Sequence, residues 1–309
     1  MGVKIILFIV IVGGIIFFVI AAPKFFEDYD LKKGLNATST EKIVSSAQKA
    51  TIKAAPSAQS SIATPSSSGK KEISDSRIPS GFSREQLSPF FEKIRIASAS
   101  FSTGYNKPSI IRLYSRLESG DSPIDITGWR LKSNRSEFII PKAVEIYKPS
   151  GANEEKNIIL LSNNYVNIYS TTSVINKNFR LNKCAGYLEN SFDFNPSLPQ
   201  SCPMVYRSRY EIAYLSGQCQ TYLFSLGGCK AVDYSFYNSL LTGTSEGNVC
   251  RAFLNTVGTY GNCFEKYSQD KDFLSSEWRL WVNNDILDSQ HDRLNLFDNN
   301  GLLVSDYIY

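Results

Sequence analysis

The sequence has very little of the chemistry that metal sites use. It contains one histidine among 309 residues, His291, and no two of its cysteines have the Cys-x-x-Cys spacing that binds zinc. His291 is flanked by Gln290 and Asp292, without a cysteine pair or an acidic cluster around it. Protein metal sites combine several such ligands at short, regular spacings. The sequence therefore predicts no bound metal and no cofactor.

Concentrated positive charge is also missing. The formal net charge is +4 at pH 7, and from position 93 onward basic and acidic residues are nearly equal in number. Binding of DNA or RNA depends on a concentrated positive field that meets the phosphates. Nucleic acid is therefore not an expected partner of the folded part.

Charged and strongly polar residues are absent from Ile5 to Ala22. As a helix this run would span about 27 Å, close to the thickness of a bilayer's hydrocarbon core. The alternative is a cleaved signal peptide, because Ala21 and Ala22 resemble the small residues of a cleavage site. However, the run is long for a signal, and Pro23 would directly follow the cut. We expect residues 5–22 to form an uncleaved transmembrane anchor.

Large apolar side chains are scarce in the next segment, residues 23–90, which includes the string AAPSAQSSIATPSSSGKKE. A segment rich in Ser, Ala, Thr and Pro cannot bury enough surface to offset its ordering entropy. We expect it to be a flexible linker that holds the folded part away from the membrane.

Cysteine is absent before position 184. The six that follow are Cys184, Cys202, Cys219, Cys229, Cys250 and Cys263. An even, clustered set without metal-ligand spacing predicts disulfide bonds in an oxidising compartment. The alternative, buried thiols in a cytosolic protein, lacks any supporting pattern. We therefore expect the folded part on the extracytoplasmic side, at the cell surface or in the periplasm, although counting positive charges around the anchor would place it inside.

Short runs of alternating apolar and polar residues begin at position 93. They lie at 93–101, 109–117, 123–133, 136–147, 156–164 and 178–184, and again at 277–288 and 292–309. A period of two with one polar face indicates antiparallel strands, and several such strands indicate a sandwich or barrel. Asn300 and Gly301 predict a tight hairpin turn. A calcium loop is the alternative there, but its ligand series stops after Asn300 and lacks the distal glutamate.

The stretch between the two groups of strands, residues 184–275, has a helical pattern. Residues 210–229 and 248–263 each predict a short helix that ends at glycines and has a cysteine near either end. Packed as an antiparallel pair, these helices would give the bridges 219–263 and 229–250, with 184–202 as a separate loop. Sequential bridges, 219–229 and 250–263, are the second choice, and the sequence alone does not settle the pairing.

The string SPIDITGWRLKS, followed by FIIP, closely resembles the lamin tail domain, an immunoglobulin-like β-sandwich of nuclear lamins and many bacterial surface proteins. The resemblance extends to IIRLYSRLESGD and to the closing DRLNLFDNNGLLVSDYIY. Two features depart from the family: Arg112-Leu113 stands where Glu-Leu is common, and ordinary lamin tails lack the cysteine-bearing stretch, which looks more like membrane-anchored bacterial lamin-tail proteins. The resemblance implies a mainly β, lamin-tail-like antiparallel sandwich over residues 91–183 and 276–309, with residues 184–275 inserted as a small helical, disulfide-rich lobe.

The same string has a physical reading. Ile124 and Ile126 would point into the sandwich, Asp125 and Gly128 would turn the chain, and Trp129 would fill the centre of the core. Large aromatic side chains often anchor a small β core in this way. The alternative is that Trp129 is an exposed platform for a ligand.

One string suggests an enzyme. GTSEG matches the nucleophile elbow of α/β-hydrolases, in which Ser245 would attack, His291 would be the base, and Asp270 or Asp285 would orient it. An elbow follows a buried strand within βαβ units, whereas the preceding chain has an antiparallel β pattern. We therefore expect no catalytic residues, and we expect Ser245 or a neighbouring threonine to cap a helix that begins near Asn248.

Aromatic residues gather in the cysteine-bearing stretch: Tyr206, Tyr210, Tyr214, Tyr222, Phe224, Tyr234, Phe236 and Tyr237. They are typical either of the core of a small disulfide-linked lobe or of a recognition surface. We expect a non-enzymatic, membrane-tethered protein that presents its lobe for protein contact, adhesion or envelope architecture. The alternatives are an envelope serine hydrolase and a surface module that binds glycan or nucleic acid. The partner and the oligomeric state stay open.

Overall fold

The computed structural model describes residues 73–104, 107–240, 243–290 and 292–309. All of them belong to one unit, Gly69–Tyr309. The predicted anchor at 5–22, the linker as far as residue 72 and the lone histidine lie outside the described residues. Within the described ranges, no helix combines the length and the apolar character that crossing a membrane requires.

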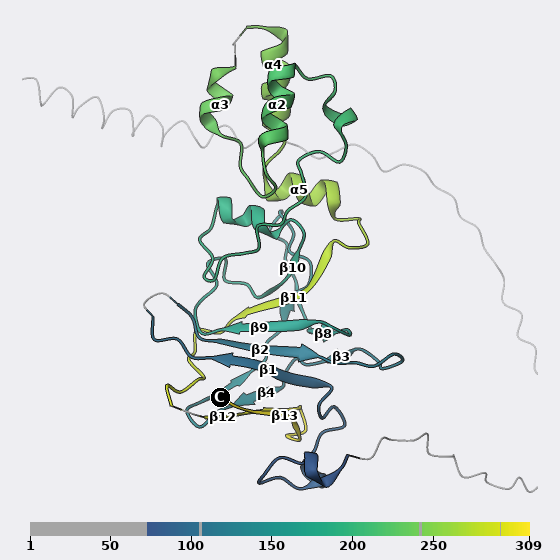
Figure 1. Cartoon of the computed structure of the whole chain (residues 1–309), viewed down its shortest axis with the longest axis vertical. Coiled ribbons are helices and arrows are strands. Elements are labelled where there is room, and N and C mark those ends of the chain that lie inside the picture. Colours follow the sequence, from purple (N-terminus) through teal and green to yellow (C-terminus); the bar gives the residue numbers. More distant parts are fainter. Residues whose placement is uncertain (1–72, 105–106, 241–242, 291) are drawn as a thin grey trace, which may run out of the picture. The chain divides into compact units, whose positions relative to one another are not determined.

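The described part is mainly β, as predicted, with a few small helices (Figure 1). A seven-stranded sheet has the order β1-β2-β9-β11-β10-β6-β7. In this order its strands are Ile94–Ser100, Ile110–Ser115, Tyr165–Tyr169, Leu274–Trp281, Phe179–Asn182, Ala143–Val144 and Glu155–Lys156. A four-stranded sheet follows the order β13-β12-β4-β5, with the strands Leu303–Ile308, Arg293–Phe297, Arg130–Lys132 and Glu137–Ile139. The short strands β3 (Ile124–Asp125) and β8 (Ile159–Leu160) form a separate pair.

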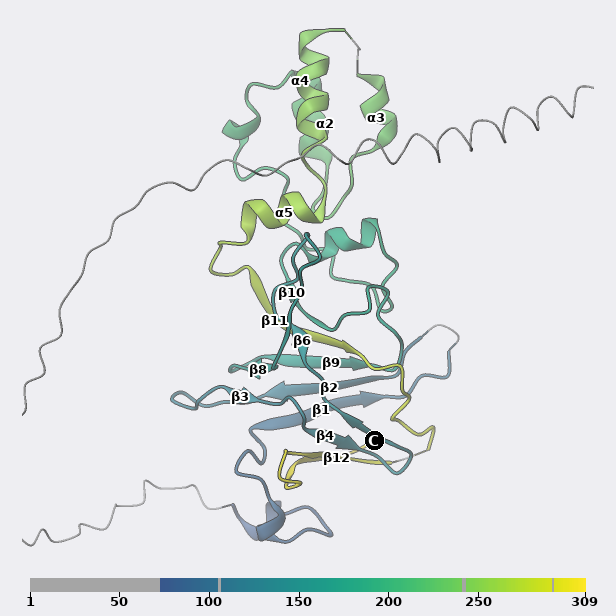
Figure 2. The same ribbon diagram turned by 180° about the vertical axis from the view of Figure 1, so that it is seen from behind.

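Antiparallel pairing predominates, as in β1, β2 and β9, which lie side by side in Figure 2. Two pairs are parallel: β11 with β9, and β10 with β6. The prediction of a purely antiparallel arrangement is therefore wrong at these two places. Parallel neighbours need a long crossover connection, and the chain between β9 and β11 contains the whole cysteine-bearing stretch, which supplies one.

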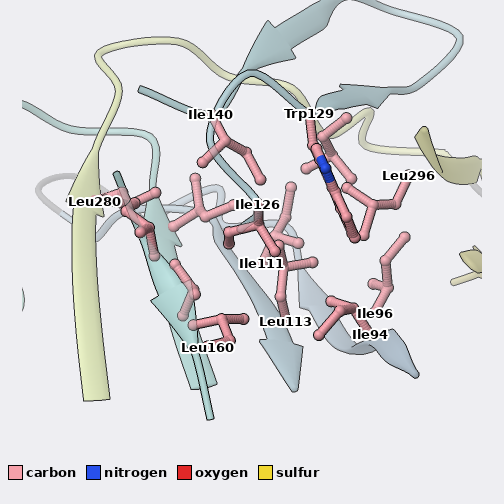
Figure 3. Packing of buried hydrophobic residues seen from close by; sticks show 14 of the residues in the cluster. Ile94, Ile96, Ile111, Leu113, Ile126, Trp129, Ile140, Leu160, Leu280 and Leu296 are labelled. Carbon is pink, nitrogen blue, oxygen red and sulfur yellow. The ribbon is translucent and has the colours of Figure 1, made fainter. Parts of the chain in front are cut away.

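The two larger sheets share one apolar core. Trp129 is only 1% exposed and lies in the same cluster as Leu113 of β2, Leu280 of β11 and Leu296 of β12. In Figure 3 the labelled side chains from these strands point into a common interior. Ile124 and Ile126 are buried in this cluster as well. The burial excludes the alternative of Trp129 as an exposed platform, and it stabilises the fold through the hydrophobic effect.

The turn between β3 and β4 requires a glycine. Gly128 has a φ of +84°, and a Cβ at this position would lie 2.8 Å from Asn299 Oδ1. The Gly128 N–H donates to the Ile140 carbonyl at 2.8 Å, and Asp125 Oδ1 accepts from the Thr127 N–H at 2.9 Å. A side chain at position 128 would be strained in this conformation and would collide with Asn299. The string SPIDITGWRLKS therefore needs glycine at this position.

The last two strands, β12 and β13, form an antiparallel hairpin. Of the residues in its loop, Gly301 has a positive φ of +76° and Asn300 does not. The Asp298 carboxylate accepts from the N–H groups of Asn300 and Leu302, at 2.9 and 3.0 Å. The loop is therefore wider than the tight two-residue turn expected at Asn300-Gly301, because the aspartate side chain stabilises its backbone.

Residues 73–90, expected as the end of the flexible linker, pack against the four-stranded sheet instead. They contain two 3₁₀ helices, Asp75–Arg77 and Arg84–Gln86. Leu87 forms a β-bridge with Leu303, and these two residues belong to a small apolar cluster. Ile73, Ile78 and Phe82 pack against this cluster. The linker prediction is wrong for this part because these apolar side chains do find surface to bury.

The described residues of the cysteine-bearing stretch 184–275, which we call the helical segment, form four α-helices rather than the two short helices predicted. Its α-helices are α2 (Gly217–Ser225), α3 (Tyr234–Ser239), α4 (Ser245–Leu254) and α5 (Tyr260–Tyr267). Two 3₁₀ helices, Ala185–Asn190 and Arg209–Ile212, precede them. Each α-helix begins after a polar residue whose side chain accepts a backbone N–H, the usual N-cap: Ser216, Asp233, Thr244 and Thr259.

Candidate functional site

All six cysteines form disulfides, as predicted, but the predicted pairings are wrong. The bridges join Cys184 to Cys263, Cys202 to Cys229, and Cys219 to Cys250. Neither the nested set nor the sequential set contains any of these three pairs.

The error at Cys263 comes from one turn in the chain. Residues 248–263, predicted as part of a single helix, belong to α4 and α5, which a turn at Gly258 separates. Gly258 has a φ of +75°, and a Cβ there would lie 3.2 Å from the Lys230 carbonyl oxygen. Because the chain changes direction at this close approach, Cys263 lies on α5 and meets Cys184 near the end of β10. Cys250 stays on α4, where it bonds to Cys219 of α2.

The Cys219–Cys250 bridge lies at the centre of a small core. Both cysteines are completely buried, and the surrounding apolar residues include Ile212, Leu223 and Leu254. Tyr222 and Phe236 stack with ring centroids 3.7 Å apart at the side of this core. Half of the aromatic residues singled out in the sequence, Tyr206, Tyr222, Phe236 and Tyr237, are partly buried against it. These four rings therefore act as core, as one of the two interpretations predicts.

The other four aromatic residues singled out in the sequence, Tyr210, Tyr214, Phe224 and Tyr234, are exposed. Tyr210 is 91% exposed, Tyr234 75%, Tyr214 65% and Phe224 40%. The Arg209 guanidinium lies 4.8 Å from the centre of the Phe224 ring. We call Arg209, Tyr210, Tyr214 and Phe224 the aromatic surface. Tyr and Arg are enriched at the energetic centres of protein interfaces, so this group has the chemistry of a recognition surface.

A cluster of charged side chains joins the segment that precedes the aromatic surface to the chain just before β11. Arg207 Nη2 donates to Asp270 Oδ1 at 2.9 Å, and Lys183 Nζ lies 3.1 Å from Asp270 Oδ2. The hydrogen bonds from Arg207 and Lys183 hold the pKa of Asp270 below its usual value. The Arg207 guanidinium also lies 4.4 Å from the centre of the Tyr267 ring. These contacts orient the backbone from which the aromatic surface projects.

The residues of the hydrolase alternative have other partners. Ser245 is the first residue of α4, whose cap is the Thr244 side chain, and the segment before it is the helix α3 rather than a strand. The predicted helix thus begins a few residues earlier than expected. Asp270 is held by Arg207 and Lys183, and Asp285 lies 3.7 Å from Arg135. His291 is outside the described residues, so its distance from Ser245 is not defined.

Metal ligands do not converge in the part of the chain that the structure describes: no group of three or more His, Cys, Asp or Glu residues lies together there. Comparisons with protein families, with curated proteins and with solved structures found no match to this chain.

One polar group of interest was not singled out in the sequence. Glu277 and Arg279 are buried together on β11, with Glu277 Oε1 2.7 Å from Arg279 Nε. The signal was present in EWRLW, because alternation places Glu277 and Arg279 on one face of the strand and Trp278 and Leu280 on the other. Charged side chains are seldom buried in a strand unless they are paired and hydrogen-bonded.

Proposed function

We propose that this chain is a non-enzymatic, membrane-tethered protein of the extracytoplasmic side, whose helical segment makes contact with another protein. In this proposal the apolar run at 5–22 is the anchor, and the sheets form a lamin-tail-like, immunoglobulin-like sandwich that presents residues 184–275. The observation that carries it is the aromatic surface, with Tyr210 exposed over 91% of its area on a segment held by disulfides.

The exposed position of these rings is the physical argument. An exposed tyrosine or phenylalanine gains little in the free protein, but on binding it buries a large rigid area at low conformational cost. Two nearby disulfides restrict the motion of the backbone that carries them, so less ordering entropy is lost when a partner binds. This combination suits a surface for protein contact.

Three further observations support the rest of the proposal. Three disulfides and no free cysteine among the described residues suit an oxidising compartment. A core shared by two sheets around Trp129 supports the lamin-tail resemblance of the string that contains it. The helix before Ser245 supports a non-enzymatic role, because a nucleophile elbow follows a strand.

Site-specific photo-crosslinking tests the proposed contact. A photo-reactive phenylalanine analogue is placed at position 210 of the full-length chain in its source cells, and at position 308 as the control. Ile308 is also well exposed but lies on β13, away from the aromatic surface. We expect a protein adduct from position 210 that is lost when Tyr214→Ser and Phe224→Ser are added, and none from position 308. Equal adducts from both positions, or none, would contradict the proposal.

Protease accessibility tests the location independently. A protease added to intact cells, or to cells with a permeabilised outer envelope, should cleave the folded part while cytosolic proteins remain intact. Protection equal to that of a cytosolic protein would reject the extracytoplasmic side.

A further inference from the structure

A polar network covers the face of the seven-stranded sheet that points away from Trp129. Glu277 Oε1 accepts from Asn167 Nδ2 at 2.9 Å and from Arg279 Nε at 2.7 Å, and Glu277 Oε2 accepts from the Tyr165 hydroxyl at 3.0 Å. Arg112 Nε donates to Asn167 Oδ1 at 2.8 Å. These residues come from the three neighbouring strands β2, β9 and β11. Since each carboxylate oxygen can accept two hydrogen bonds, Oε2 retains one acceptor position.

The sheet is interrupted beside this network by a wide bulge. Arg180 of β10 is opposite Trp278, and Asn182 is opposite Leu274, so the three residues 275–277 face a single residue of β10. The Ser275 carbonyl accepts from Arg180 Nε at 2.7 Å, and the Ser275 hydroxyl accepts from the Glu277 N–H at 2.9 Å. Bulges are over-represented next to functional sites, and this one lies beside Glu277, which lines an opening there.

A cavity of about 300 Å³ lies at the bulge. Its apolar lining includes Leu181, Pro199 and Phe273, and its polar lining includes Glu277, the Tyr165 side chain and three serines, Ser201, Ser275 and Ser276. Ligand pockets begin at roughly this size and combine apolar walls with a few placed polar groups. The cavity can therefore hold one small ring that has an apolar face and polar edges.

The charges around the cavity are compensated within the protein. Lys183, which lines it, has its Nζ 2.6 Å from Asp272 and 3.1 Å from Asp270. Glu277 is paired with Arg279. Burial and the neighbouring Glu277 raise the pKa of Tyr165, so its hydroxyl remains protonated at neutral pH and donates to the carboxylate. Because each of these charges already has an opposite partner in the protein, a charged ligand of either sign would gain little there, and the cavity favours an uncharged ligand that forms hydrogen bonds.

We propose that this cavity binds a neutral, hydroxyl-rich ring, a single pyranose unit such as the end of a glycan chain or a free monosaccharide. The apolar wall faces the C–H side of the sugar, while Glu277 Oε2 and the serines at the bulge exchange hydrogen bonds with its hydroxyl groups. The site lies on other residues than the aromatic surface, so it does not depend on the proposed protein contact.

Saturation-transfer NMR on the full-length chain tests this site. The probes are the methyl pyranosides of glucose, galactose, mannose and N-acetylglucosamine, with the corresponding free sugars, each at about 10 mM, which detects a Kd in the millimolar range. We expect saturation transfer to at least one of these sugars and none to the methyl protons of methyl phosphate or to ethylammonium. A methyl glycoside that binds as well as its free sugar indicates the end of a chain, and a preference for the free sugar indicates a monosaccharide.

Variants assign the binding to the cavity. Ser201→Trp fills the cavity from an exposed loop position, and Ser276→Phe fills it from β11, so one variant remains informative if the other misfolds. The matched control, Ser191→Trp, places the same ring at an exposed position outside the lining. We expect a loss of affinity of about tenfold or more in the filled variants and no change in the control. Absence of transfer to every sugar, stronger transfer to methyl phosphate, or binding unchanged in both folded filled variants would overturn the proposal.

Discussion

The sheets and the helical segment are stabilised in different ways. The core between the two larger sheets is built from Trp129 and many aliphatic residues, and it contains no cysteine. The core of the helical segment is smaller, and the Cys219–Cys250 bridge is at its centre. A larger core can stabilise its fold through apolar burial alone, whereas a small core commonly depends on covalent links. The comparison shows where this chain uses each source of stability.

Truncating Trp129 should have the largest effect and should act on the sheets. We expect Trp129→Ala to lower the free energy of unfolding by about 4 kcal/mol, since it removes a buried indole and leaves a cavity. Urea denaturation followed by circular dichroism measures this. The matched control is Tyr210→Ala, which removes an exposed ring and should change stability by less than about 0.5 kcal/mol. Similar losses of stability in the two variants would contradict a stabilising role of Trp129 as the centre of the core.

Removing the Cys219–Cys250 bridge should act on the helical segment. Its partners are separated by 31 residues, and loss of a link over such a loop should lower stability by about 3–4 kcal/mol. In the double variant Cys219→Ser, Cys250→Ser we expect amide hydrogen exchange to accelerate in α2 and α4 while the amides of β2, β9 and β12 remain protected. Equal loss of protection in these strands would mean that the two regions unfold as one cooperative unit.

Loss of the contacts of Asp270 with Arg207 and Lys183 should have the smallest effect on stability, and this effect should depend on pH. Hydrogen bonds from Arg207 and Lys183 lower the pKa of Asp270 from its usual value of 3.8. A group whose pKa is lowered in the folded state contributes stability above its unfolded pKa, and it loses this contribution as the pH falls through the lower folded value. Below about pH 4 the amides of the helical segment should therefore lose protection relative to those of the sheets, compared with neutral pH.

Asp270→Asn should abolish this acid dependence, whereas the exposed Asp193→Asn should preserve it. Paired hydrogen-exchange measurements at neutral and acid pH compare the two variants. An unchanged acid dependence in Asp270→Asn would assign it to other carboxyl groups. The effect should be modest because the cluster is solvent-accessible and screened.

Much of the β region could be predicted because its pattern is local. The alternation around Ile111 and Leu113 placed β2, and the string ending in Trp129 indicated a buried anchor. The exception is β9, the central strand Tyr165–Tyr169, which was not predicted; the continuous apolar run Ile158–Leu161 next to it has the stronger apolar signal. Val166 and Ile168 of β9 face the shared core, whereas Asn167 on the opposite face is buried through its hydrogen bonds with Arg112 and Glu277.

The candidate sites could be predicted only in part. The sequence located the aromatic residues of the helical segment but did not separate Tyr210, which is exposed, from Tyr222, which is packed against the core. The cavity beside Glu277 was not predictable, because it depends on a bulge in the pairing of β10 with β11. Such register shifts depend on partners that are distant along the chain.

The sequence by itself determined the mainly β character of the folded part, the burial around Trp129 and the oxidation of the six cysteines, because alternation, side-chain size and cysteine spacing act over short distances along the chain. Only the tertiary structure decided which cysteines pair, which tyrosines reach the surface and where the sheet opens beside Glu277. These outcomes depend on contacts between distant segments, such as the close approach of Gly258 to Lys230, and no local pattern encodes them.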